Sequence, residues 1–343
     1  MALHGILVPL VTPFSATGGI AADALQTLAR DVLDQGAAGI VALGTTAEAA
    51  ALDATERRLV IELCAEVCQE RGAALVVGAG ANDTAAGAAA LAGLGKWPRI
   101  TAALVPVPSF TRPGEAGVIA HFTRLAAHSP VPLLVYHVPY RTAQPLRTAA
   151  LRELAALPNV AGTKFATGAL DGAAVELLAD CPPGFAVLAG DDLLLSPMLA
   201  LGAAGGIAAS AHLATRRFAD LADAWARGDA AAARPLGHRL VRISAAVFAE
   251  PNPVVLKGAL HALGRIPTPD VRLPLLPAAP DTVGALLQRL AELDQAEPGD
   301  ARSAPDHLAE QPVPADDLDR PRGRREGRGE PSDGMAVDVS SAR

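Results

Sequence analysis

Short apolar runs alternate with longer segments of helical periodicity along most of the chain. Each run has four to seven residues and is rich in Val, Ile or Leu, as expected for strands that are buried on both faces of a parallel sheet. The runs cover residues 5–11, 39–43, 74–78, 100–105, 131–136, 160–165, 185–189 and 206–209. Helical patterns between them cover 22–35, 54–71, 114–127, 146–156 and 171–179. The sequence therefore predicts alternating strands and helices.

Eight such strands indicate an α/β fold, and they fit a parallel (β/α)8 TIM barrel better than a doubly wound sheet. No Gly-x-Gly-x-x-Gly motif follows the first strand, which weakens the dinucleotide-binding alternative. Asp53 and Asp83 are expected to be helix N-caps, and Gly36, Gly72 and Gly95 are expected to end helices.

Three further helical stretches follow the barrel pattern, at 229–248, 253–263 and 280–294. We therefore expect a (β/α)8 barrel over 1–227, a C-terminal helical region over 228–296 and a disordered tail over 297–343. Pro, Gly, Asp and Arg dominate the tail, and a short basic run lies at 320–328. The run could contact nucleic acid or a protein partner, but a solvated low-complexity tail is the preferred interpretation.

The composition argues against several classes of protein. The 343 residues carry a formal net charge of −7, which argues against a nucleic-acid-binding surface over the body of the protein. Three cysteines, Cys64, Cys68 and Cys181, are too few for a disulfide framework, and we interpret them as small buried hydrophobes. The N-terminus lacks the basic region of a signal peptide, and no segment predicts a transmembrane span. We expect a cytoplasmic protein.

Lysine is rare in this chain, since only Lys96, Lys164 and Lys257 occur among 29 basic residues. Lys164 falls inside a strand pattern. A lysine that points into a barrel is desolvated, and desolvation favours the neutral amine, which can attack a carbonyl carbon. The alternative is a structural ion pair with a carboxylate such as Asp191. We interpret Lys96 and Lys257 as structural.

Other candidate side chains lie at the C-terminal ends of the expected strands, where the active sites of TIM barrels form. Thr45 and Thr46 follow a strand end, so their hydroxyls and amides could hold a carboxylate; the alternative is an ordinary turn. Tyr136 could relay a proton, or it could be a core tyrosine with a satisfied hydroxyl. Arg141 could bind a second carboxylate through two hydrogen bonds, or form a surface ion pair.

Taken in chain order, these residues point to one family. The chain resembles the dihydrodipicolinate synthase/N-acetylneuraminate lyase family of class I aldolase-like barrels, from about residue 5 to residue 277. The matching pieces are 8–14, Gly44-Thr45-Thr46-x-Glu48, Gly80-Ala81-Asn82, Arg112-Pro113, Tyr136-x-Val138-Pro139-x-Arg141-Thr142, Gly162-x-Lys164-x-Ala166-Thr167-Gly168, Gly190-Asp191-Asp192 and Glu250-Pro251-Asn252-Pro253. The Thr45-Thr46 and Arg141-Thr142 pairs favour the synthase branch of this family.

The resemblance implies a lyase that condenses pyruvate with L-aspartate 4-semialdehyde to form 4-hydroxy-tetrahydrodipicolinate, in lysine and diaminopimelate biosynthesis. The implied catalytic residues are Lys164, Tyr136 and Thr45, and the implied substrate-binding residues are Thr45, Thr46, Arg141, Gly190 and Ile207. Lys164 would form a Schiff base with pyruvate without a metal or an organic cofactor. The implied partners are small-molecule substrates and further copies of the chain in a homodimer or homotetramer.

Within that resemblance, five of the other site residues have an implied role. Thr45 and Thr46 would hold the carboxylate of pyruvate, and Ile207 would pack over its methyl group. Tyr136 would move protons, and Arg141 would receive the carboxylate of the semialdehyde.

The chain departs from the family pattern at several positions. Ser109 and Phe110 stand where the synthases usually carry two adjacent tyrosines, the second of which completes a Tyr–Thr–Tyr proton relay across a subunit interface. Phenylalanine cannot carry a proton, so Tyr140 or Ser109 is a candidate substitute. Other departures are Ala47, His137 and the alanines Ala49, Ala54 and Ala86 at lysine-feedback positions, so inhibition by lysine is not expected, although Asn82 is retained.

Two alternatives to this synthase function remain open. The first is a related pyruvate-dependent class I aldolase, or a 2-keto-3-deoxy acid lyase or dehydratase, that uses a different aldehyde; Phe110 favours it. The second is a non-catalytic paralogue that binds a keto acid. The presence of Lys164, Tyr136 and Thr45 together argues against the second alternative.

Overall fold

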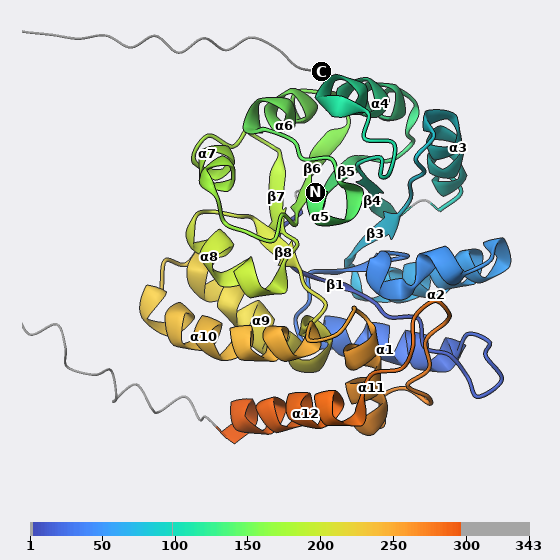
Figure 1. Ribbon diagram of the computed structural model, residues 1–343, viewed down its shortest axis with the longest axis vertical. Helices are drawn as coiled ribbons and strands as arrows, with labels where there is room; N and C mark the ends of the chain where they lie inside the picture. The colour runs from blue at the N-terminus through green and yellow to red at the C-terminus, as the bar shows by residue number, and fades with distance from the viewer. Residues whose placement is uncertain (1–2, 98, 296–343) are drawn as a thin grey trace, which may run out of the picture. The chain divides into compact units, whose positions relative to one another are not determined.

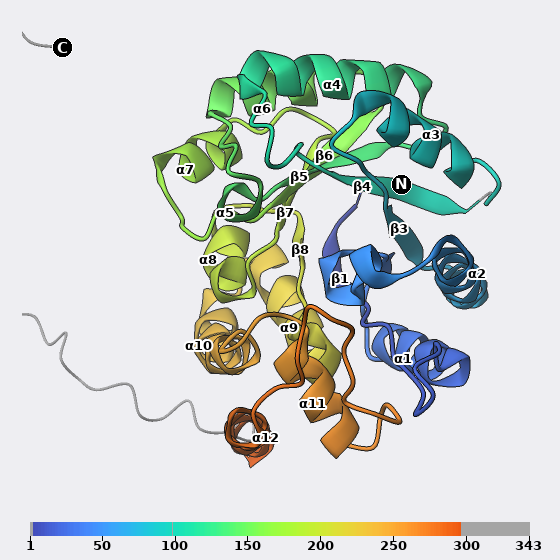
Figure 2. The same cartoon turned by 45° about the vertical axis from the view of Figure 1, so that its right-hand side comes forward.

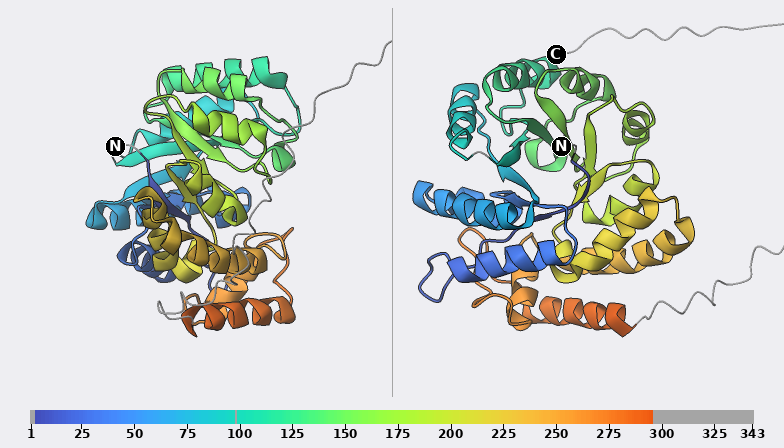
Figure 3. Two further views of the ribbon diagram at one scale, coloured as in Figure 1. Left: turned by 90° about the vertical axis from the view of Figure 1, so that its left-hand side faces the viewer. Right: turned by 180° about the vertical axis from the view of Figure 1, so that it is seen from behind.

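Eight parallel strands form a closed barrel in the order β1-β2-β3-β4-β5-β6-β7-β8 (Figure 1). The computed structural model describes residues 3–97 and 99–295. Each strand pairs with its neighbours in the chain, and β8 closes the barrel on β1, where Leu7 is in register with Ile207. Helices surround the strands, as the view from behind shows (Figure 3). The predicted TIM barrel is confirmed.

The strands are β1 (Gly5–Pro9), β2 (Gly39–Ala42), β3 (Ala74–Gly78), β4 (Ile100–Pro106), β5 (Leu133–His137), β6 (Val160–Phe165), β7 (Ala186–Ala189) and β8 (Gly205–Ile207). Two of them, β3 and β6, have the predicted bounds. The first predicted strand, 5–11, extends too far at its C-terminal end, because β1 ends at Pro9, before Leu10. The amide of Val11 donates to Nε2 of His212 (3.2 Å), so the backbone leaves the strand ladder there.

The helices are α1 (Ala22–Asp34), α2 (Ala54–Arg71), α3 (Thr84–Leu94), α4 (Gly114–His128), α5 (Pro139–Thr142), α6 (Thr148–Ala155), α7 (Gly172–Ala179), α8 (Leu195–Ala200), α9 (Ala211–Ala226), α10 (Ala230–Val247), α11 (Val254–Ala262) and α12 (Pro280–Gln295). Short 3-10 turns are η1 (Thr45–Ala47), η2 (Ala49–Ala51) and η3 (Asp192–Leu194). Four helices, α3, α5, α8 and α9, lie outside the predicted helical ranges, although the expected caps bracket α3.

The predicted helix ends are confirmed, with one difference in conformation. Asp53 forms a capping box with Glu56, and the side chain of Asp83 accepts a hydrogen bond from the amide of Ala86 (2.7 Å). Gly72 ends α2 in the left-handed region (φ 63°), where glycine is favoured. Gly95 ends α3 with φ −61°, a right-handed conformation that does not require glycine.

Alternate residues of each strand point into the barrel or out toward the helices. The inward-facing cluster includes Leu7, Val41, Leu104, Tyr136 and Ile207, all buried. The outward-facing residues pack with the helices in a larger cluster that contains the first two cysteines of the chain. Those two cysteines are buried as predicted, whereas the third is half-buried.

The C-terminal helices lie together on one side of the barrel (Figure 2). Helix α10 packs against α9, and α12 packs against both α10 and α11. The boundary at 227/228 between the barrel and the C-terminal helical region stays a prediction. The predicted tail, 297–343, including its basic run, lies outside the described residues. No helix among residues 3–97 and 99–295 is long and apolar enough to cross a membrane.

Candidate active site

All seven predicted site residues line one cavity of about 110 Å³ at the C-terminal end of the barrel. They are Thr45, Thr46, Tyr136, Arg141, Lys164, Gly190 and Ile207. They come from β5, β6 and β8 and from the segments that follow β2, β5 and β7. Parallel strands bring these segments together because their carboxyl ends meet at one face of the barrel.

Lys164 and Tyr136 occupy paired positions on neighbouring strands. They are in register between β6 and β5, so both side chains point into the barrel. The ammonium of Lys164 lies 4.5 Å from the centre of the Tyr136 ring, and only 8% of the residue is exposed. Lys164 is therefore a nearly buried amine that borders the cavity beside a phenol.

The structural alternative for Lys164, an ion pair with Asp191, is not observed. The Asp191 carboxylate accepts a hydrogen bond from the amide of Gly168 (2.8 Å). Within the part of the chain that the structure describes, Lys164 has no carboxylate within the 4.0 Å limit of an ion pair. Its amine is not engaged by a fixed counter-ion.

Thr45 and Thr46 begin a 3-10 turn directly after Gly44, which has an extended backbone (φ −70°, ψ −178°). The hydrogen bonds of the turn start at the amide of Ala47, which donates to the carbonyl of Gly44 (3.0 Å). The amides of the two threonines therefore lie ahead of the bonded part of the turn, as at a helix start. Amides and hydroxyls grouped in this way form a small anion-binding surface.

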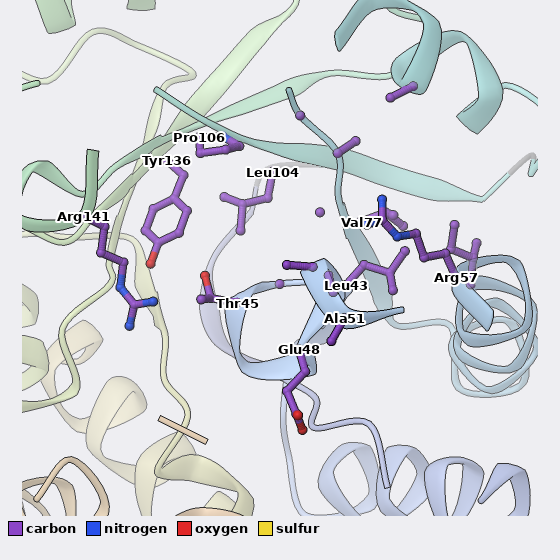
Figure 4. Close-up of a pocket in the computed structure, with 18 of the residues that line it drawn as sticks. Leu43, Thr45, Glu48, Ala51, Arg57, Val77, Leu104, Pro106, Tyr136 and Arg141 are labelled. Atoms are coloured by element: carbon purple, nitrogen blue, oxygen red, sulfur yellow. The ribbon is translucent and has the colours of Figure 1, made fainter. Parts of the chain in front are cut away.

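The two threonines differ in their surroundings. Thr46 is 4% exposed, and its hydroxyl accepts a hydrogen bond from Nδ2 of Asn252 (2.9 Å). Thr45 is exposed, and its hydroxyl faces the same space as the hydroxyl of Tyr136 and the guanidinium of Arg141 (Figure 4). Of the two threonines, Thr45 is thus the one whose hydroxyl faces Tyr136.

Arg141 lies in the short helix α5, which starts at Pro139, two residues after the end of β5. Its Nε donates to the hydroxyl of Tyr140 (3.4 Å), and its guanidinium carbon lies 5.5 Å from the Tyr140 ring centre. No ion pair holds Arg141 among the described residues, so the surface ion-pair alternative is not observed. The guanidinium is available to an anion at the cavity mouth.

Two carboxylates line the cavity without a role in the predicted site. Asp191 and Asp192 follow β7, and Asp192 accepts a hydrogen bond from the amide of Ser210 (2.6 Å). Burial raises the pKa of both carboxyls, while hydrogen bonds from Gly168 and Ser210 and the charge of Lys164 act in the opposite direction. The paired aspartates after the seventh strand pattern are the sequence signal that could have marked them.

Of the two candidate substitutes for the missing tyrosine, only Tyr140 lines the cavity. The hydroxyl of Ser109 instead donates to Oδ1 of Asn82 (3.0 Å). Phe110 is 93% exposed and has a left-handed backbone (φ 67°), a conformation that costs a bulky residue energy. Within this chain, therefore, the aromatic ring at position 110 does not reach the cavity.

A larger cavity of about 640 Å³ adjoins the first, and Thr45, Tyr136, Arg141 and Asn252 line both (Figure 4). Its wall is mostly apolar, with Leu104 among its members. Among residues 3–97 and 99–295, no group of three or more His, Cys, Asp or Glu side chains is placed to hold a metal ion.

Comparison with known proteins decides the family. The model of the dihydrodipicolinate synthetase family matches residues 2–292 of the chain. The chain belongs to this family. The resemblance inferred from the motifs is therefore confirmed, and the chain is a lyase-type enzyme of the dihydrodipicolinate synthetase family.

Individual members of the dihydrodipicolinate synthetase family are similar over most of the chain. The 4-hydroxy-tetrahydrodipicolinate synthases of Neisseria meningitidis serogroup B and Pseudomonas aeruginosa are each 38% identical, covering 80% of this chain and 93% and 92% of their own lengths. The crystal structure of the chloride-inhibited dihydrodipicolinate synthase from Acinetobacter baumannii, complexed with pyruvate, is 31% identical. It covers 85% of this chain and 99% of its own, with a TM-score of 0.81.

Proposed function

We propose that the enzyme condenses pyruvate with L-aspartate 4-semialdehyde to form 4-hydroxy-tetrahydrodipicolinate and water, as the names of its relatives imply. The observation that carries the proposal is the position of Lys164, a nearly buried amine without a counter-ion, in a cavity with Thr45 and Arg141. The Thr45–Thr46 turn and the guanidinium of Arg141 offer separate groups to bind two carboxylates. A reaction between two carboxylate-bearing substrates requires both.

The first half of the reaction forms a covalent intermediate. The amine of Lys164, after it has lost its proton, attacks the keto carbon of pyruvate, whose carboxylate binds the hydroxyls and amides of Thr45 and Thr46. Tyr136 delivers a proton to the carbinolamine hydroxyl, which leaves as water, and the product is a protonated Schiff base. This cation withdraws electrons from the methyl group, so loss of a methyl proton yields a nucleophilic enamine without a metal or organic cofactor. Ile207 provides an apolar wall for that methyl group.

The second half joins the two substrates. Arg141 binds the carboxylate of the semialdehyde and places its aldehyde carbon against the enamine. The new carbon–carbon bond converts the aldehyde into an alkoxide, which takes a proton. The amino group of the semialdehyde then attacks the Schiff-base carbon, closes the ring and expels the amine of Lys164.

The proton relay includes Tyr136, Thr45 and, as a further part of the proposal, Tyr140. Tyr140 lines the cavity and its hydroxyl contacts Nε of Arg141, so it lies beside the proposed aldehyde site. It replaces the hydroxyl that Phe110 cannot supply. A cytoplasmic location and a homodimeric or homotetrameric assembly also remain proposals.

A trapping experiment tests the mechanism. Borohydride added with pyruvate should reduce the Schiff base and leave a covalent mass on the peptide that contains Lys164, and Lys164→Arg should abolish the adduct. No adduct in the wild-type enzyme would contradict the mechanism and favour a non-catalytic keto-acid-binding protein.

A second assay identifies the aldehyde. Aspartate 4-semialdehyde should be consumed when the reaction is coupled to a reductase that acts on the cyclic product. If the adduct forms but the semialdehyde is inert, the enzyme is instead an aldolase, lyase or dehydratase for another substrate, the alternative that Phe110 favours.

A further inference from the structure

The third lysine, Lys257, is fully buried although it lies in α11, outside the barrel strands. Its ammonium donates to Oε1 of Glu48 (2.9 Å) and to the carbonyl of Thr12 (2.9 Å). It also lies 4.0 Å from the centre of the Phe14 ring. These contacts hold the buried ammonium against the segments that carry Glu48, Thr12 and Phe14.

The partner, Glu48, is the residue that directly follows the Thr45–Ala47 turn. Its backbone is left-handed (φ 53°), an unfavourable conformation for a residue with a side chain, and its amide closes the turn by donating to Thr45 (3.1 Å). Its second carboxylate oxygen accepts a hydrogen bond from the amide of Arg272 (2.7 Å). Both oxygens are therefore held by the C-terminal region, and they fix the residue that ends the turn.

Two more contacts hold the same turn. Nδ2 of Asn252 donates to the hydroxyl of Thr46 (2.9 Å), and the hydroxyl of Thr12 donates to the carbonyl of Ala47 (2.8 Å). The carbonyl of that same Thr12 accepts from Lys257. Three consecutive residues of the chain, 46 to 48, are thus each tied to a residue far away in the sequence.

A contribution to the free energy of unfolding does not by itself explain the ion pair of Lys257 with Glu48. Removing two charges from water carries a large desolvation penalty, and apolar replacements of similar volume are often neutral or stabilising. The arrangement does something that an apolar pair cannot do, because directional hydrogen bonds define where Glu48 and its backbone lie. The carboxylate of Glu48 points away from the hydroxyl of Thr45 (Figure 4). Glu48 lines the larger cavity, but neither Glu48 nor Lys257 lines the smaller one that contains Lys164.

We propose that Lys257 and Glu48 are positioning residues, which hold the Thr45–Thr46 turn in the geometry that binds the carboxylate of pyruvate. The inference rests on the proposed function of that turn. The proposal gives the C-terminal helical region a role in the active site, because α11 supplies the ammonium of Lys257 and the segment before α11 supplies Asn252.

Kinetics of single and double variants test the proposal. Lys257→Met should raise the KM for pyruvate about tenfold, because the turn that it holds binds the carboxylate of pyruvate. The fall in kcat should be smaller, about threefold, because Thr45 is the one residue of the turn in the proton relay. It should also lower the melting temperature, since Glu48 stays buried and unpaired. Adding Glu48→Gln to it removes the charge and keeps an acceptor for the amide of Arg272. The double variant should recover the melting temperature but keep the raised KM.

Lys96→Met, at an exposed lysine, is the matched control and should change neither quantity. Thr12→Val is the second variant, used also if Lys257→Met does not fold. It removes the hydroxyl bond to Ala47 without leaving a charge, and it should raise the KM for pyruvate in the same direction.

Recovery of the KM together with the melting temperature in the double variant would overturn the proposal, as would an unchanged KM in Thr12→Val. Failure of the proposed function is seen separately, because the wild-type enzyme would then form no borohydride adduct with pyruvate. If the wild type forms the adduct, the pyruvate concentration that gives half-maximal trapping supplies a second measure of the variants.

Discussion

Gly190 leaves the space that the side chain of Lys164 occupies. A Cβ atom at Gly190 would lie 2.9 Å from Cγ and 3.0 Å from Cε of Lys164, and 2.8 Å from Cβ of Ala166. These separations are shorter than ordinary contacts between carbon atoms. Gly190 was expected as a substrate-binding position; in the structure, a side chain there would meet Ala166 and the predicted nucleophile, Lys164.

Gly190→Ala should therefore displace the amine of Lys164 from the cavity. We expect borohydride trapping with pyruvate to slow by about 100-fold, because a shift of about 1 Å at a reacting group has an effect of this size. Gly172→Ala is the control, since a Cβ there meets no atom within 4 Å. Equal trapping rates in the two variants would mean that Lys164 tolerates the added methyl group.

Replacing Arg141 should separate the two halves of the reaction. Arg141→Met removes charge-assisted hydrogen bonds to the second substrate, so we expect the KM for aspartate 4-semialdehyde to rise by about 10- to 100-fold. Schiff-base formation with pyruvate should continue, as measured by the mass of the reduced adduct. Loss of that adduct in Arg141→Met would place the guanidinium at the pyruvate site instead.

His212 should make the stability of the protein depend on pH. The ring is fully buried, with Nδ1 2.8 Å from the carbonyl of Ala209 and Nε2 accepting from the amide of Val11 (3.2 Å). This pattern requires the neutral ring with its proton on Nδ1, and burial lowers its pKa to about 4. The unfolded chain, with the ordinary pKa of 6.5, binds more protons between these values.

The stabilisation by neutral His212 is therefore complete above about pH 6.5 and is lost as the pH falls toward 4, by about 3 kcal/mol in total. Urea unfolding of the wild type and of His212→Asn, measured at several pH values between about 4 and 6.5, checks the prediction. The variant should be less stable near neutral pH but show a smaller pH slope, with a remaining slope from His137, whose pKa burial also lowers to about 4. If stability depended on pH with the same slope in the wild type and in His212→Asn, His212 would be excluded as a source of that dependence.

Lysine should not inhibit the enzyme. Ala49 is one of the residues that line the larger cavity, and Ala54 and Ala86 lie in the first turns of α2 and α3. None of the three offers a polar side chain to the ammonium or carboxylate groups of lysine. Initial rates with saturating substrates should be the same with and without millimolar L-lysine. A concentration-dependent fall in rate would show that other residues bind it.

The barrel and the predicted site could be inferred from the sequence because their signals are local. Apolar runs of strand length mark the strands, and a lysine inside one such run stands out. Strand ends were less accurate: Val131 and Phe185 continue the apolar pattern, but β5 starts at Leu133 and β7 at Ala186. Hydrogen bonding, which apolarity does not report, decides where a strand begins.

The supporting contacts of the site could not be inferred, since no local pattern encodes them. Lys257 falls in an apolar helical segment, and the interpretation of it as structural names no partner. Asn252 belongs to a motif of the family, yet only the folded chain places its amide on the hydroxyl of Thr46. The same holds for Asp192, whose carboxylate accepts a hydrogen bond from the amide of Ser210, beyond β8.

The ion pair of Lys257 with Glu48 spans 209 residues of the chain. During synthesis, the Thr45–Thr46 turn leaves the ribosome long before the helix that holds it. Every strand of the barrel, through Ile207, also precedes that helix. A nascent chain whose eight strands have all been made therefore still lacks the ammonium that holds this turn. Under our proposal, it binds pyruvate well only after α11 has been added.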